Sequence, residues 1–159
     1  MTRFQIVAVA LAATLLLSAS ALAQEQKPEK KIDRSDLPRA VEKAVVEQSK
    51  GATIRGFEEE KEGGQTLYEA KLMANGRKKN VLMAADGTLV EVEEEIPAES
   101  LSAAVREGLQ AKAANGQVVK VKTITKKGKL VAYEAKVMTN GKKSEIQVGP
   151  DGKPLDHEE

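Results

Sequence analysis

Cysteine is absent from all 159 residues of the chain. The protein therefore has no disulfide, no thiol nucleophile, no thiolate metal site and no lipid-modified cysteine. Aromatic residues are scarce as well, with two tyrosines, two phenylalanines and no tryptophan. We therefore expect an aliphatic core that is stable without covalent cross-links.

An excess of charge of one sign is also missing. The chain has 25 Lys and Arg against 24 Asp and Glu, and Arg3 is the only charged residue among the first 23. Proteins that bind nucleic acid normally have a basic excess on one face, so we expect no nucleic-acid partner. The charges are unevenly spread, with a net −4 over residues 36–95 and +3 over residues 96–159. Such a distribution is typical of two halves that attract each other or a charged partner. The alternative is that these charges simply belong to a solvated surface.

Catalytic constellations are lacking too. The only histidine, His157, lies near the end of the sequence in DHEE, without a companion that would position it as a base or a metal ligand. The serines beyond the first 23 residues lack a nearby histidine or an elbow motif, and the glycines lie in turns rather than in a phosphate-binding loop. We therefore expect a non-enzymatic protein with no catalytic residue, no cofactor and no metal.

Residues 1–23 have the layout of a secretory signal. Arg3 precedes an apolar run from Ile6 to Leu17, and Ala21 and Ala23 stand at the positions that a signal peptidase recognises. The run is shorter than the ~20 residues that span a bilayer, which favours cleavage after Ala23 over an uncleaved anchor. We expect a periplasmic or secreted protein without a stable membrane anchor. The charged residues 24–35 predict a disordered leader.

Two similar stretches, YEAKLMANGRKK from Tyr68 and YEAKVMTNGKKS from Tyr133, lie 65 positions apart. Each follows an amphipathic helical pattern, capped in the first case by Ser35 or Asp36. The apolar positions of these patterns are Leu37, Val41, Ala44 and Val45, and then Leu101, Val105, Gly108 and Leu109. Short β-favouring runs follow each helix, and Asn-Gly, Asp-Gly and other glycine turns separate them, with a weak last run near KPLDHEE.

The sequence therefore predicts an α+β fold of two tandem repeats. Each repeat is a helix packed on an antiparallel β-meander of three to four strands. The predicted repeats occupy residues 36–95 and 96–159, with Glu91 to Pro97 as the connection in one continuous structure. A single unit of this size would be marginally stable, which favours association of the two.

Alternation along the strands predicts which side chains lie under the helix. Tyr68, Ala70 and Leu72 share one face, as do their counterparts from Tyr133 onward, and these side chains should pack in the core. The opposite face is the candidate exposed binding surface, because charged side chains with flexible methionines suit an adaptable contact. Its predicted residues are Glu69, Lys71, Met73, Glu134, Lys136 and Met138.

Two kinds of charged cluster have alternative interpretations. The acidic runs Glu58–Glu62 and Glu91–Glu95 would suit a divalent cation by ligand type, but their spacing matches no calcium loop and favours a solvated strand end. The basic cluster Lys120, Lys122, Lys126, Lys127 and Lys129 would dock an acidic protein surface, a lipid head group or a polysaccharide, or would guard an exposed strand edge.

The order LP..V..AV, YEAK, NG.K and a late DG resembles the PepSY-like family of exported modules, which is related to β-lactamase-inhibitor-like folds. The matching residues are Leu37, Pro38, Val41, Ala44, Val45, Tyr68, Glu69, Asn75, Gly76, Asp86 and Gly87, and in the second copy Leu101, Val105, Tyr133, Glu134, Asn140, Gly141, Asp151 and Gly152. The second copy departs at Ser102 and Gly108, where the first has Pro38 and Ala44. The resemblance implies a tandem helix-plus-sheet protein of the cell envelope, which regulates peptidases or other exported enzymes by presenting a sheet surface.

The sequence thus predicts an exported binding module with a protein partner, such as an inhibitor or regulator of an envelope peptidase. The alternative is an envelope sensor that binds a divalent cation or small ligand through its acidic clusters.

Overall fold

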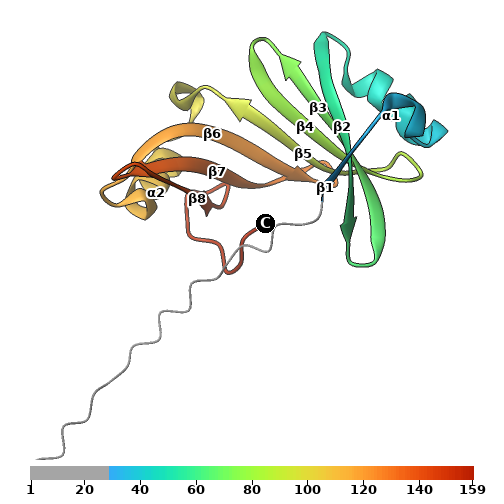
Figure 1. Cartoon of the computed structure of the whole chain (residues 1–159). Coiled ribbons are helices and arrows are strands. Elements are labelled where there is room, and N and C mark those ends of the chain that lie inside the picture. The colour runs from blue at the N-terminus through green and yellow to red at the C-terminus, as the bar shows by residue number, and fades with distance from the viewer. Residues whose placement is uncertain (1–28) are drawn as a thin grey trace, which may run out of the picture.

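The computed structural model describes residues 29–159, which form one curved antiparallel sheet with two short α-helices (Figure 1). The eight strands lie in sequence order, and each pairs with its neighbours along the chain. The strands are β1 (Glu29–Ile32), β2 (Ala52–Glu62), β3 (Gln65–Ala74), β4 (Arg77–Ala84), β5 (Leu89–Ile96), β6 (Gln117–Lys126), β7 (Lys129–Thr139) and β8 (Lys142–Val148). The helices are α1 (Arg39–Gln48) and α2 (Ala103–Ala113), and the short 3₁₀ turns are η1 (Arg34–Asp36) and η2 (Ala98–Ser100). Neither α1 nor α2 has the length and apolar content that a membrane crossing requires.

The predicted fold class of two tandem helix-on-meander repeats is wrong. One sheet continues from β1 to β8, because β5 pairs with β4 along one edge and with β6 along the other. The predicted boundary after Glu95 falls inside β5, where Ile96 still pairs with Val121, and most of the predicted connection Glu91–Pro97 is therefore strand. Joining at β5 removes two strand edges that separate sheets would expose.

The ends of the sheet also differ from expectation. The predicted signal and residues 24–28 lie outside the described residues, but Glu29–Ile32, the middle of the predicted disordered leader, form strand β1 against β2. Ile32 packs on the apolar cluster beneath α1, which explains the pairing of this otherwise charged segment. The predicted last strand near KPLDHEE does not form, because β8 ends at Val148.

Both helices pack on the same face of the sheet, where the core lies. Val41 and Val45 of α1 are fully buried among side chains of β3 and β4, and Val105 and Leu109 of α2 are buried against β6, β7 and β8. These are the apolar positions that the helical spacing predicts. Tyr68 and Tyr133 pack against the two clusters as predicted, although both remain partly exposed.

The helix starts are only partly as expected. Pro38 rather than Ser35 or Asp36 is the N-cap of α1, and no side chain caps that helix. Ser102 caps α2, where its hydroxyl oxygen accepts a hydrogen bond of 3.3 Å from the Val105 amide. Ser102, which stands where the first copy has Pro38, is therefore an effective N-cap for α2.

A close approach of α2 to the turn after β8 explains the second departure, Gly108. A Cβ on Gly108 would collide with the carbonyl of Gly152, and a Cβ on Gly152 would collide with the carbonyl of Ala104. Gly152 also has a φ of +81°, which disfavours other residues. Both glycines are needed for this turn to lie against the helix.

Alanine at Gly152 is expected to destabilise the fold more than alanine at Gly128. Gly128 has a similar φ of +78° but nothing near its missing Cβ, so its substitution carries only the backbone cost of about 1 kcal/mol. The collision at Gly152 should add about 1–3 kcal/mol. Thermal unfolding of the two variants tests this, and equal melting temperatures would contradict the close packing.

Candidate functional site

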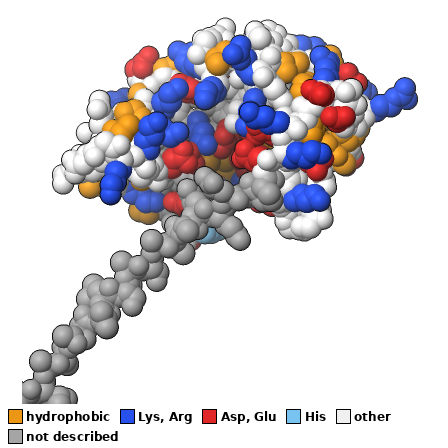
Figure 2. Space-filling view, viewed as in Figure 1, with side chains coloured by type: hydrophobic (Ala, Val, Ile, Leu, Met, Phe, Trp, Pro, Cys, Tyr) orange, Lys and Arg blue, Asp and Glu red, His pale blue; other side chains and the backbone are white. Residues whose placement is uncertain are grey.

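The sheet face opposite α1 and α2, here called the open face, has no helix over it within the part of the chain that the structure describes. A groove of about 1100 Å³ extends along it, from Glu60 on β2 to Gln147 on β8. A second hollow of about 390 Å³ adjoins it and shares Glu93, Lys122 and Glu134. Acidic and basic side chains are mixed over the visible surface of the molecule, with hydrophobic ones among them (Figure 2). Most of the residues that line the two hollows are lysines and glutamates. The open face is therefore a charged groove rather than an apolar one.

Strand register places the acidic run of β5 against the basic cluster of β6. Glu91 lies directly opposite Lys126 and Glu95 opposite Lys122, so the side chains share the open face. The ion pairs are Glu95–Lys120 at 3.1 Å, Glu93–Lys122 at 2.6 Å and Glu91–Lys126 at 3.7 Å. The interpretation of the lysines as guards of an exposed edge is wrong for these three, because β6 lies between β5 and β7.

A second ionic cluster lies on β1, β2 and β3. Lys71 contacts the carboxylates of Glu58, of Glu69 at 3.2 Å and of Glu29 at 3.9 Å. Glu58 and Glu69 lie directly opposite one another in the β2–β3 pairing. Like charges in that position repel, so the ammonium group of Lys71 holds them together.

All six predicted binding residues lie on the open face, but two of them are buried. Glu69 is 9% exposed and Glu134 is 7% exposed, so the expectation of an exposed surface is wrong at these positions. Burial follows from their ion pairs, because Lys71 and Lys122 lie over them. Lys71, Met73, Lys136 and Met138 remain partly exposed.

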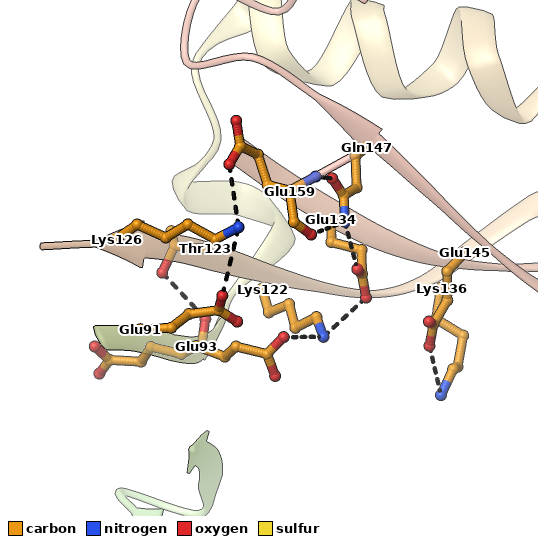
Figure 3. A network of polar contacts seen from close by, with 11 residues as sticks. Glu91, Glu93, Lys122, Thr123, Lys126, Glu134, Lys136, Glu145, Gln147 and Glu159 are labelled. Carbon is orange, nitrogen blue, oxygen red and sulfur yellow. Dashed lines mark hydrogen bonds and ion pairs between the residues drawn. The ribbon is translucent and has the colours of Figure 1, made fainter. Parts of the chain in front are cut away.

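A polar network links the second half of the open face (Figure 3). Lys122 contacts Glu93 at 2.6 Å and Glu134 at 2.9 Å, and the Gln147 amide nitrogen donates to Glu134 at 2.9 Å. Gln147 also bonds the backbone of Glu159, whose carboxylate lies 3.2 Å from Lys126. Sequence reasoning missed Gln147 and Glu159, because the β7–β8 register sets Gln147 opposite Glu134 and only the turn after β8 brings Glu159 back to it.

Burial and neighbouring charges change the pKa of several of these groups. Burial raises the pKa of Glu69 to about 7; the Lys71 charge opposes this change, and the Glu60 and Glu58 carboxylates add to it. For Glu58 burial acts in the same direction, but hydrogen bonds from Lys71 and with Glu29 outweigh it and lower the pKa. Burial favours neutral Lys122, yet the charges of Glu93 and Glu134 prevail and raise its pKa.

Apolar side chains are also buried on the open face. Ile124 is 1% exposed and its cross-strand partner Ala132 is fully buried, although neither belongs to the clusters under the helices. Both share a face with Lys122 and Glu134. The aliphatic stems of long charged side chains cover apolar surface in this way while their head groups stay in contact with water or a partner.

The open face offers hydrogen bonds and charged groups to a ligand. His157 is 81% exposed and lies 3.9 Å from the Glu159 carboxylate. Within residues 29–159, no group of three or more His, Cys, Asp or Glu side chains is placed to hold a metal ion. In the two acidic runs, Glu58, Glu91, Glu93 and Glu95 contact lysines.

Glu69→Gln is expected to stabilise the protein at pH 8 and to have little effect at pH 5. Because the folded pKa of about 7 exceeds the ordinary value of 4.5, the folded chain keeps a proton that the unfolded chain loses in this range. Stability therefore falls as the pH rises from 4.5 to 7, by up to roughly 3 kcal/mol, and the neutral amide escapes this loss.

Melting temperatures of the native chain and the variant across pH 5–8 test the expectation. Glu59→Gln, which removes a carboxylate from the other face of β2, is the control. A Glu69→Gln variant that is less stable than the native chain at pH 8 would show that the Lys71 contact outweighs burial.

Comparison with known proteins places the fold. No family model and no curated protein matches the chain. A DUF2874 family protein from Bacteroides ovatus is 20% identical over 76% of this chain and 85% of its own, with a TM-score of 0.60. A BLIP-like protein from Bacteroides fragilis is 23% identical over 75% and 83%, with a TM-score of 0.56. A protein from Bacteroides eggerthii, described as periplasmic, is 20% identical over 75% and 86%, with a TM-score of 0.62. At these identities the likeness concerns the fold alone, and the chain has the fold of these proteins.

Proposed function

We propose that this chain is an exported, non-enzymatic module that binds a protein partner through its open face. The partner would be an envelope peptidase or another exported enzyme, which the module inhibits or regulates. The observation that carries the proposal is the long groove of the open face, over which residues 29–159 place no helix. A sheet face of this kind is a ready contact surface for a macromolecule.

The charged side chains of the groove support this function because their contacts hold them in place. Lys122 is fixed between Glu93 and Glu134, and Lys71 between Glu58 and Glu69. Side chains that are ordered before binding lose less conformational entropy when a partner arrives. Their alternating signs would select a partner with complementary charges.

Membership of the PepSY-like family is also part of this proposal. The repeated stretches from Tyr68 and from Tyr133 support it, and so does the fold shared with a BLIP-like protein. Export is likewise part of the proposal, and the signal-like residues 1–23 and the fold shared with a protein described as periplasmic support it.

Charge reversal on the open face is expected to abolish capture of the partner. Lys78 and Lys136 line the same hollow, so the double variant Lys78→Glu and Lys136→Glu should retain less than about a tenth of the partner captured by the native chain from its own envelope extract. The measurement is quantitative affinity capture with the purified protein as bait.

The matched control reverses Arg39 and Lys43 to Glu, which makes the same charge change on α1, on the other face of the sheet. Both double variants should melt within a few degrees of the native chain, because the four side chains are surface-exposed or half-buried. Equal loss of capture in the two variants would show that binding depends on net charge rather than on the open face.

Calcium is expected to leave the melting temperature unchanged at millimolar concentration. Glu58 of the first acidic run and Glu91, Glu93 and Glu95 of the second already contact lysines, and a cation would have to displace these contacts. A ligand at 100 times its Kd stabilises a fold by about 2.7 kcal/mol, which a thermal scan detects easily. A rise of several degrees with Ca²⁺ but not with Mg²⁺ would favour the alternative function, an envelope cation sensor.

A further inference from the structure

The segment after β8 turns back onto the open face. The Gly149 amide donates to the Lys153 carbonyl at 2.8 Å and closes the turn. Residues 154–159, here called the strap, then run under the sheet, and their end lies within its curve (Figure 1). Glu158 and Glu159 line the groove.

Gln147 binds the strap through the backbone of one residue. The Glu159 amide donates to the Gln147 side-chain oxygen at 2.8 Å, and the Gln147 amide nitrogen donates to the Glu159 carbonyl at 3.4 Å. This two-point contact resembles the pairing of two strands, with a side-chain amide in place of one backbone. Gln147 is 4% exposed and its nitrogen also donates to Glu134, so its orientation is fixed.

Lys126 binds the side chain of the same residue. Its ammonium group lies 3.2 Å from the Glu159 carboxylate and 3.7 Å from that of Glu91 (Figure 3). The site thus contacts the amide, the carbonyl and the acidic side chain of an extended residue. None of these contacts depends on the rest of the strap sequence.

The strap is held by few contacts. It forms no helix or strand, and Asp156, His157 and Glu158 are exposed. A segment with so few buried contacts belongs to the least stable part of a fold and opens readily.

We propose that the β6–β8 end of the open face is a binding site for an extended peptide with an acidic side chain. The strap occupies this site in cis, and a partner's segment of the same chemistry takes its place. The proposal rests on the proposed function, since it takes the partner to bind the open face. The strap then acts as an internal competitor that a partner must displace, and it covers Gln147 while no partner is bound.

Glu159→Pro in the full chain tests the proposal, because proline removes the amide donor and the carboxylate together. The probe is a synthetic peptide of residues 154–159, blocked at both ends, and NMR follows the side-chain amide of Gln147. In the native chain the tethered strap competes at an effective concentration on the order of millimolar. We therefore expect the variant to be half-saturated at a peptide concentration at least about tenfold lower than the native chain requires.

Three controls make the result specific. Glu158→Pro, which changes the neighbouring exposed residue, should behave as the native chain, and Glu159→Pro combined with Lys126→Met should bind the peptide more weakly than Glu159→Pro alone. A peptide with proline in place of its last glutamate should not bind. Equal binding by the native and Glu159→Pro chains, or no binding by either, would overturn the proposal. The peptide titration does not require the partner, so its failure can be distinguished from a failure of the capture experiment.

Discussion

The antiparallel pairing of β5 with β6 is the constraint on which the rest of the molecule depends. It joins the strands under α1 to those under α2, and it sets three glutamates of β5 beside three lysines of β6 on one face. A shift of one residue would turn these side chains toward the helices, where unpaired charge would be costly. The apolar core and the charged open face therefore select the same register from opposite sides of the sheet.

The buried charges of the open face are better explained by specificity than by stability. A buried ion pair gains little over apolar packing, because both partners lose their hydration, but breaking the pair is costly. Glu134 shows the consequence, since it is 7% exposed and contacts both Lys122 and Gln147. Glu69 is in a less favourable position: burial raises its pKa to about 7, and the Glu60 and Glu58 carboxylates add to this rise.

Local sequence patterns predicted the parts of the structure that depend on local physics. The helical spacing of Val41 and Val45, the alternation from Tyr68, and the Asn-Gly turns each found the correct side or position. The pairing of strands could not be predicted in the same way, because alternation along a strand does not show which other strand will lie along each of its edges. The continuous sheet, strand β1 and the burial of Glu69 and Glu134 all depend on that pairing. The same reason hid Gln147, which has an ordinary polar position in its own strand and gains its role from β7 and the strap.

The two halves of the open face differ in what they leave available. On the β1–β3 side, Lys71 is shared among three carboxylates, so the surplus charge is negative and would favour a cationic contact. On the β6–β8 side, Gln147 presents both a donor and an acceptor, which suits a peptide backbone whatever its side chains. A single partner that spans the groove would thus meet an acidic end on β1–β3, and on β6–β8 an end where Gln147 contacts its backbone and Lys126 an acidic side chain. The two ends lie on different strands, so substitutions could alter one without the other.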